Sequence, residues 1–189
     1  MARSPLRIAL LVEARDHASF LDLWVRRRVE AGADPEAAWR TAREGRLAAV
    51  LDDEAVVVML AAIEHQVVGF VVAAVGPLSV LTETRALTVE DMYVDPAHRR
   101  RGVSLAMLRA LAQHAERSGW RHLGVNLDAQ DRAAHRTLAR LGFEPTLTRR
   151  VSSTAALLRR LEAPFAVGQR AVLQRRRVQR ARGGVAGCA

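Results

Sequence analysis

Apolar residues follow two different periods along this chain, and the changes of period predict its elements. Alternating or continuous apolar runs indicate strands, and apolar residues three or four apart indicate helices. The predicted strands are 7–12, 55–63, 67–75, 89–94, 123–127 and 146–151, and the predicted helices are 16–30, 34–44, 103–117 and 131–141. This order predicts an α/β fold with a mixed, mostly antiparallel central sheet and helices on both faces.

Several boundaries are predicted from single residues. Asp16 is expected to cap the first helix, and Pro35 to occupy the first helical position of the second. Gly76-Pro77 is expected to end the second strand of the hairpin, because proline has no N–H for a ladder. The helix after residue 102 is expected to turn one apolar stripe inward, formed by Leu105, Leu108, Ala112 and Ala115.

The stretch Val89–Ala112 combines a strand, a short basic loop and a helix. Asp95-Pro96 ends the strand, and Arg99–Arg101 and Gly102 precede the helix. A helix N-terminus offers unpaired N–H groups and partial positive charge to an anion. Glycine permits close approach of a ligand, and arginine adds charge-assisted contacts to phosphate. The loop therefore predicts a pyrophosphate site, and the alternative is a solvated basic turn.

Two blocks of the sequence resemble those of one enzyme family. Arg99–Ser104 is similar to the [QR]-x-x-G-x-[GA] loop of the GNAT superfamily of acetyl-CoA-dependent N-acetyltransferases, with Ser104 at the last position. The strand 123–127, Asp131 and a helix that ends before Gly142-Phe143 are similar to the family's second block. The resemblance is most specific over 89–145. Asp131 stands where asparagine is usual, and Leu138 stands where many members carry a tyrosine general acid.

The resemblance implies a GNAT-like sheet whose central strand pair splays apart to admit the pantetheine arm. It implies that acetyl-CoA is the co-substrate and that the acetyl group passes to a primary amine by direct attack in a ternary complex. The end of the central strand, the basic loop and part of the second block would then hold the co-substrate. The implied residues are Met92, Tyr93, Val94, Arg99, Arg100, Arg101, Gly102, Val103, Ser104, Leu105, Asp131 and Ala134.

Acetylation of an amine is helped by a base, because an aliphatic ammonium has a pKa of about 10.4. Glu90 and Asp91 are neighbours on a predicted strand and are expected to point to opposite faces. Simple alternation places Glu90 on one face with Thr88, Met92 and Val94. The run 90–94 is also similar to the corresponding strand of diamine-type acetyltransferases. Glu90 is the favoured base and Asp91 the second candidate; alternatively, both are ordinary solvated carboxylates.

The sequence offers no clear general acid. Leu138 cannot donate a proton, and Tyr93 is expected to be a packing residue. His135, one turn before Leu138, is either a candidate donor or a surface histidine. A thiol has a pKa near 8.5, so a thiolate can leave without a dedicated acid. The remaining histidines show no metal-ligand spacing, so no metal is expected.

Composition sets the outer limits of this interpretation. The chain has 189 residues, 50% of them hydrophobic, and its one cysteine is Cys188. These values fit one domain with an aliphatic core and exclude an internal disulfide and a cysteine metal cluster. No apolar run approaches the length of a membrane span, so a cytoplasmic protein is expected.

The net charge of +9 is concentrated in the last part of the chain. Residues 149–189 contain ten arginines and one acidic residue, Glu162. We therefore expect an acetyltransferase domain at 1–151 and an arginine-rich, partly disordered extension at 152–189. Two alternatives stay open, a non-catalytic acyl-CoA-binding module and a nucleic-acid-associated protein whose tail makes weak contacts with nucleic acid or an anionic surface. The sequence does not identify the small-molecule or peptide amine acceptor, and a homodimer is compatible with it.

Overall fold

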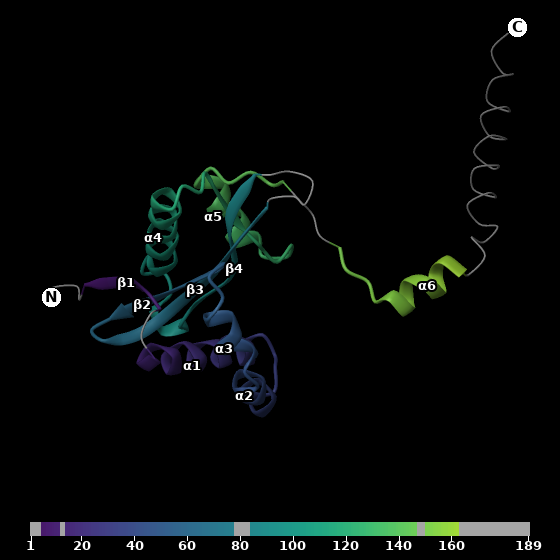
Figure 1. Cartoon of the computed structure of the whole chain (residues 1–189), viewed down its shortest axis with the longest axis horizontal. Helices are drawn as coiled ribbons and strands as arrows, with labels where there is room; N and C mark the ends of the chain where they lie inside the picture. The colour runs from purple at the N-terminus through teal and green to yellow at the C-terminus, as the bar shows by residue number, and fades with distance from the viewer. Residues whose placement is uncertain (1–4, 12–13, 78–83, 147–149, 163–189) are drawn as a thin grey trace, which may run out of the picture. The chain divides into compact units, whose positions relative to one another are not determined.

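The structure is a computed structural model that describes residues 5–11, 14–77, 84–146 and 150–162 (Figure 1). The chain divides into two compact units, Met1–Arg136 and Thr137–Ala189, and the first unit holds the whole sheet. Among the helices in the described residues, none has the apolar length that a membrane crossing requires.

Five strands form one sheet, in the spatial order β1-β2-β3-β4-β5. They are β1 (Leu6–Leu10), β2 (Val56–Ile63), β3 (Gln66–Pro77), β4 (Arg85–Val94) and β5 (His122–Val125). Neighbouring strands are antiparallel up to β4, and β5 pairs parallel with β4. The predicted mixed, mostly antiparallel α/β sheet is therefore confirmed.

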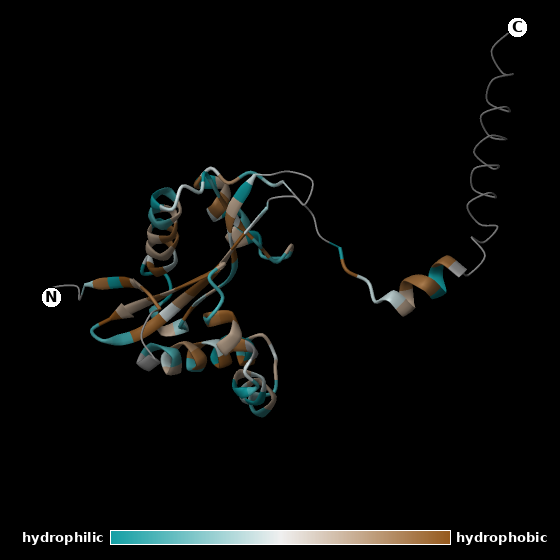
Figure 2. Ribbon diagram, in the orientation of Figure 1, coloured by the Kyte–Doolittle hydropathy of each residue, from teal (hydrophilic) through white to brown (hydrophobic). Residues whose placement is uncertain are grey.

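Helices cover both faces of this sheet. The helical elements are α1 (Ala14–Glu30), α2 (Pro35–Arg43), α3 (Arg46–Leu51), the 3₁₀ turn η1 (Pro96–His98), α4 (Val103–Arg117), α5 (Arg132–Arg140) and α6 (Thr154–Glu162). Helix α4 contacts all five strands from one face, and Figure 1 shows α1 and α3 against the other. Figure 2 shows mainly hydrophobic residues along the strands and polar residues at the β2–β3 turn.

An aromatic cluster joins α1 to the middle of the sheet. Phe20 of α1 packs edge-on against Phe70 of β3, with ring centroids 5.1 Å apart. Phe70 in turn lies 6.0 Å from the ring of Tyr93 on β4, and all three rings are buried. Tyr93 is thus a packing residue, as predicted. The cluster fixes α1 against the strand that carries both candidate bases.

Strand β4 contains a bulge at Glu90. Ala73 of β3 lies opposite Val89, and Val72 lies opposite Asp91, so Glu90 is an extra residue on β4. The parallel ladder with β5 ends at the pair Val89–Val125, whereas β4 continues to Val94. Beyond Val89, β4 and β5 therefore separate, and Glu90 lies where the separation begins.

The bulge corrects the predicted facing of Glu90. Met92 lies opposite Val71 and Thr88 lies opposite Ala74, and these two β3 residues are three positions apart. Met92 and Thr88 therefore point to opposite faces, so Glu90 cannot share one face with both of them. Strict alternation predicted a common face because it cannot register an inserted residue.

The inner face of α4 also differs from the prediction. Leu105 is 52% exposed and Ala112 is exposed, whereas Leu108 and Ala115 are buried as expected. The buried stripe is Val103, Met107, Leu108, Leu111 and Ala115. The helix is thus rotated from the predicted orientation, and Met107 and Leu111 of its buried face are fully buried.

Several strand predictions differ from the structure, including the ends of β1 at Leu10 and of β5 at Val125. Strand β3 continues through Gly76 and Pro77, which lie opposite Ala86 and Arg85 of β4. Proline is tolerated there because the β2–β3 ladder ends at the Val56–Ala74 pair, so that side of β3 needs no N–H from residue 77. Of the strand expected at 146–151, residues 146, 150 and 151 are not in a strand, and residues 147–149 lie outside the described residues.

The helical boundaries differ in two places. Helix α1 begins at Ala14, so Asp16 lies in its first turn instead of capping it, whereas Pro35 does begin α2 as predicted. Helix α3 was not predicted, because six residues are too short to show a helical period. Its Leu47 and Leu51 pack against the aromatic cluster.

Within the expected extension, residues 154–162 form helix α6, which was not predicted. The Ser153 hydroxyl caps it by accepting a hydrogen bond from the N–H of Ala156 at 3.2 Å. Leu157, Leu158 and Leu161 are 47%, 50% and 57% exposed. Residues 163–189 lie outside the described residues, and the domain boundary at 151 stays a prediction.

We predict that a chain ending at Ser153 folds like the full chain. The leucines of α6 remain about half exposed, so their removal should change the free energy of unfolding by less than about 1 kcal/mol. Thermal unfolding of the two chains in one buffer measures this difference. A loss of several kcal/mol would show that the extension belongs to the folded domain.

Candidate active site

The loop between β4 and α4 contains two residues with left-handed backbone. Arg100 has φ 58° and Gly102 has φ 80°. The conformation suits glycine, whereas for a non-glycine residue it costs on the order of 1–3 kcal/mol. Strain of this kind concentrates at binding loops, and successive N–H groups in such a conformation form a concave anion site.

Helix α4 presents an uncapped N-terminus to this loop. Gly102 is the residue before the helix and has no side chain to bond the first N–H groups. By contrast, Asp34 accepts from the N–H of Ala37 at the start of α2. The start of α4 is anchored by Val103, which is buried, while Ser104 and Leu105 are exposed. The N–H groups of this turn are thus available to a bound anion.

The three arginines of the loop have different surroundings. Arg100 and Arg101 are exposed and form no ion pair with any residue in the described part of the chain. The Arg99 guanidinium is held in place, because its Nε donates to the carbonyl of Val94 at 2.9 Å and its Nη2 donates to Glu30 at 2.7 Å. It also lies 5.6 Å from the centre of the Tyr93 ring. Arg100 and Arg101 are therefore the side chains free to reach a phosphate.

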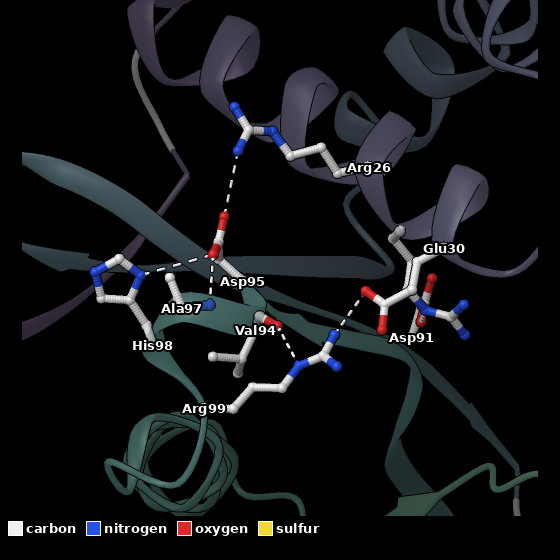
Figure 3. A network of polar contacts seen from close by, with 9 residues as sticks. Arg26, Glu30, Asp91, Val94, Asp95, Ala97, His98 and Arg99 are labelled. Atoms are coloured by element: carbon white, nitrogen blue, oxygen red, sulfur yellow. Dashed lines mark hydrogen bonds and ion pairs between the residues drawn. The ribbon is translucent and has the colours of Figure 1, made fainter.

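Ion pairs join the C-terminal half of α1 to β4 and the loop, as Figure 3 shows. The pairs are Arg26–Asp95 at 3.2 Å, Arg27–Asp91 at 3.3 Å and Glu30–Arg99 at 2.7 Å. Asp95 also accepts from the N–H of Ala97 at 2.9 Å and so caps η1. The end of β4 and the turn after it are therefore tied to one helix.

Two titratable groups in this network have shifted pKa values. The hydrogen bond from Arg99 lowers the pKa of Glu30, so this carboxyl is ionised well below neutral pH. Burial raises the pKa of Tyr93, and the neighbouring Glu30 carboxylate raises it further. A charged Glu30 and a neutral Tyr93 hydroxyl therefore face each other over the physiological range.

Glu90 lies at the point where β4 and β5 separate. Its side chain is exposed, and its carboxylate accepts a hydrogen bond from Asn126 Nδ2 at 2.9 Å. Asn126 directly follows β5, and its backbone N–H donates to the carbonyl of Val89 at 2.9 Å. Asn126 thus closes the parallel ladder with its backbone and orients Glu90 with its side chain.

Asp91 is more fully engaged than Glu90. Its Oδ1 accepts from Arg27 Nε at 3.3 Å and from the N–H of Met92 at 2.9 Å. Val72 of β3 lies opposite Asp91 and packs against the cluster that contains Phe20 of α1. Asp91 therefore lies on the face of the sheet that α1 covers. Two donors therefore occupy one oxygen of Asp91, whereas the carboxylate of Glu90 is bound by one amide.

Beyond Val89, the space between the separating strands β4 and β5 is called the gap. The last residues of β4 turn backbone groups toward it. The N–H of Asp95 donates to Val68 of β3 at 2.9 Å, so alternation directs the N–H and carbonyl groups of Met92 and Val94 away from β3. The Met92 N–H binds Asp91, and the Val94 carbonyl binds Arg99. The Val94 N–H is then the backbone donor placed to meet a ligand in the gap.

The residues of the second block have mainly structural contacts. Asp131 caps α5 by accepting from the N–H groups of Ala133 at 3.1 Å and Ala134 at 2.9 Å. Leu138 is buried, and Gly142 follows α5 with φ 88°. His135 is exposed, and its Nε2 lies 3.2 Å from the carbonyl oxygen of Asp128. The hydrogen bonds of Asp131 and His135 are thus local contacts within residues 128–135.

The structure adds three residues that sequence reasoning missed. Asn126, Arg27 and Glu30 contact Glu90, Asp91 and Arg99 respectively. Asn126 was missed because the sequence placed it inside the predicted strand 123–127, whereas β5 ends at Val125. The two α1 residues carried no signal, since charged residues on a helix usually face solvent. Within the described residues, no three His, Cys, Asp or Glu side chains lie close enough together to hold a metal.

A model of the acetyltransferase (GNAT) family matches residues 16–143, which includes the loop, both candidate bases and Asn126. No curated protein matches this chain. Among solved structures, a ribosomal-protein-alanine N-acetyltransferase from Brucella melitensis biovar Abortus 2308 is 25% identical, with a TM-score of 0.62. That match covers 78% of this chain and 98% of the other.

Two aminoglycoside acetyltransferases share the fold. AAC(6')-Iy, in complex with the bisubstrate analogue CoA-S-monomethyl-acetylneamine, is 18% identical with a TM-score of 0.63, and the match covers 80% of this chain and 99% of that one. AAC(6')-IG from Acinetobacter haemolyticus is 22% identical with a TM-score of 0.60, and the match covers 78% and 97%.

Proposed function

We propose, since this chain belongs to the acetyltransferase (GNAT) family, that it transfers the acetyl group of acetyl-CoA to a primary amine by direct attack in a ternary complex. One observation carries the proposal. The loop with two left-handed residues, Arg100 and Gly102, follows the end of β4, and the same strand carries Glu90 where it separates from β5. A phosphate site would position acetyl-CoA, and a base beside it would assist removal of the proton from the acceptor ammonium.

The loop would hold the pyrophosphate of acetyl-CoA. The N–H groups at the start of α4, from Val103 to Leu105, and the open backbone at Gly102 provide donors, and Arg100 and Arg101 add charge. Met92, Tyr93 and Val94 would line the pantetheine path through the backbone of β4. We keep Asp131 and Ala134 as candidate contacts, although the Asp131 carboxylate occupies the N–H of Ala134 in this structure.

Glu90 would take the proton of the acceptor ammonium, directly or through water. The neutral amine then attacks the thioester carbonyl carbon and the C–N bond forms. The nitrogen releases its second proton to water, and the C–S bond breaks with loss of the coenzyme A thiolate. The Val94 N–H is a candidate donor to the carbonyl oxygen as negative charge develops there. The contacts of Asp91 favour Glu90 over Asp91 as the base, because Arg27 and the Met92 N–H both bind one Asp91 oxygen.

The thiolate of coenzyme A would leave without a dedicated acid. Leu138 has no proton to give, and His135 is bonded to the Asp128 carbonyl. A thiolate is a stable leaving group near neutral pH because a thiol has a pKa of about 8.5. The departing sulfur can then take its proton from water.

The proposal is tested by incubating the full chain with acetyl-CoA and an amine panel. The panel contains an aminoglycoside, a polyamine and a peptide with an N-terminal alanine, each also incubated without enzyme. We expect one amine to gain the mass of an acetyl group while free thiol appears in equal amount. Binding of coenzyme A without transfer to any amine would favour the non-catalytic acyl-CoA-binding module. Absence of coenzyme A binding would overturn the proposed function.

A further inference from the structure

The ion pair between Glu30 and Arg99 joins helix α1 to the candidate phosphate loop, across 69 positions in the sequence. Glu30 is the last residue of α1, and Arg99 is the first residue of the candidate phosphate loop. At 2.7 Å, their contact is the shortest of the three ion pairs that tie α1 to the end of β4, and Figure 3 shows it next to the Val94 carbonyl. Both side chains are 43% exposed, so solvent screens the attraction between their charges.

Arg99 makes three different contacts through one planar group. Its Nε binds the Val94 carbonyl, its Nη2 binds Glu30, and Tyr93 lies within 5.6 Å of its guanidinium carbon. A guanidinium that is held on both edges and packed on a ring has a fixed position. Its backbone, with φ −66° and ψ 163°, is therefore fixed just before Arg100.

The residue that follows Arg99 is the strained one. Arg100 has φ 58° without being a glycine, and such a conformation persists only where neighbouring contacts hold it. The anchored Arg99 supplies these contacts on one side, and the buried Val103 at the start of α4 supplies them on the other. Between these two anchors, the backbone turns through Arg100 and Gly102 into α4.

We propose that Glu30 and Arg99 form a brace that holds the loop Arg99–Ser104 in its anion-binding conformation from helix α1. In this proposal both are positioning residues for coenzyme A, and neither touches its phosphates. The inference rests on the proposed function, because it assumes that the loop binds coenzyme A. It assigns Arg99 a role different from that of the exposed Arg100 and Arg101, although the three are adjacent in sequence.

The direction in which Glu30→Gln changes the affinity for coenzyme A distinguishes the brace from simple electrostatics. Glu30→Gln removes a negative charge near a loop that would bind a polyanion, so charge alone predicts equal or tighter binding of coenzyme A. The brace predicts the opposite, with binding weakened about three- to fivefold, the range expected for an exposed ion pair. Glu36→Gln is the matched control, because Glu36 pairs only with Arg40 of α2, at 3.9 Å, among the described residues.

Calorimetry with coenzyme A as the probe, at one salt concentration, compares the full chain with Glu30→Gln, Arg99→Gln, their double variant and Glu36→Gln. We expect the double variant to bind no more weakly than Arg99→Gln alone, because the two residues act as one unit. For acetyl transfer, KM for acetyl-CoA should rise in Glu30→Gln while kcat stays unchanged. In the free protein, hydrogen exchange at Ala106, whose N–H donates to the Gly102 carbonyl at 3.0 Å, should be faster in Glu30→Gln than in Glu36→Gln.

The outcomes separate the brace from the function on which it rests. If the unmodified chain binds coenzyme A and Glu30→Gln binds it equally well or more tightly, the brace is wrong and the proposed function stands. Losses that add in the double variant would assign Arg99 a direct phosphate contact and would also overturn the brace. If the unmodified chain does not bind coenzyme A, both inferences fail.

Discussion

Gly102→Val is expected to weaken the binding of coenzyme A by about a hundredfold or more. Gly102 has φ 80°, a backbone conformation that a β-branched residue adopts only at a cost on the order of 1–3 kcal/mol. No atom lies within 4 Å of the position that a Cβ would take, so the folded protein has room for the side chain. The same open space is where a phosphate would approach the start of α4, and a valine there would exclude it.

Gly119→Val is the control for this prediction. Gly119 follows the other end of the same helix, has φ 78° and likewise has no atom within 4 Å of its Cβ position. Both variants should lose a similar amount of stability in thermal unfolding, since the backbone strain is alike. Only Gly102→Val should lose coenzyme A, as measured by calorimetry. Equal affinities in the two variants would show that the phosphate does not bind at this loop.

The loop could be predicted from the sequence because its signal is local. A strand, Asp95-Pro96, three arginines and Gly102 are consecutive, and each has a backbone or charge preference of its own. The mixed, mostly antiparallel sheet could be predicted for the same reason, from the hairpin and the βαβ run. The left-handed Arg100 could not be predicted, because arginine has no preference for that conformation and only the contacts around it fix it.

The bulge at Glu90 and the contacts of α1 lie beyond local sequence. A bulge is decided by pairing between two strands, here by Val72 lying opposite Asp91 while Ala73 lies opposite Val89. Helix α1 carries many charged residues, and its pattern does not indicate which of them meet β4. Glu30 becomes informative once Arg99 is known to lie 2.7 Å away. Sequence thus locates the site, whereas tertiary packing sets which side chains are free in it.

The position of α1 connects the two halves of the proposed reaction. Its ion pairs reach Asp91, next to the candidate base, and Arg99, the first residue of the candidate phosphate loop, along one face of one helix. The aromatic cluster of Phe20, Phe70 and Tyr93 holds the same helix against β4. Because these contacts share one rigid element, the gap beside β4 and the loop are positioned together.

Glu90→Gln is expected to lower kcat for acetyl transfer by about a hundredfold or more, with the affinity for coenzyme A unchanged. Proton removal by a positioned side chain contributes about 10²- to 10⁴-fold to a rate. Glutamine retains the size and can still bond to Asn126, whose Nδ2 lies 2.9 Å from Glu90 Oε2, but it cannot accept a proton. Initial rates at saturating acetyl-CoA and amine, measured across pH, test this expectation. The pH profile of the variant should lack the part that comes from ionisation of the Glu90 carboxyl group.

Asp91→Asn is the matched control for the base. Asp91 is adjacent in sequence and contacts Arg27 and the Met92 N–H, so its loss should affect the packing of α1 more than proton transfer. We expect a kcat within about tenfold of the unmodified enzyme, together with a lower unfolding temperature. A larger kcat loss in Asp91→Asn than in Glu90→Gln would make Asp91 the base. Small losses in both variants would show that water takes the proton, and that the Glu90–Asn126 contact is structural.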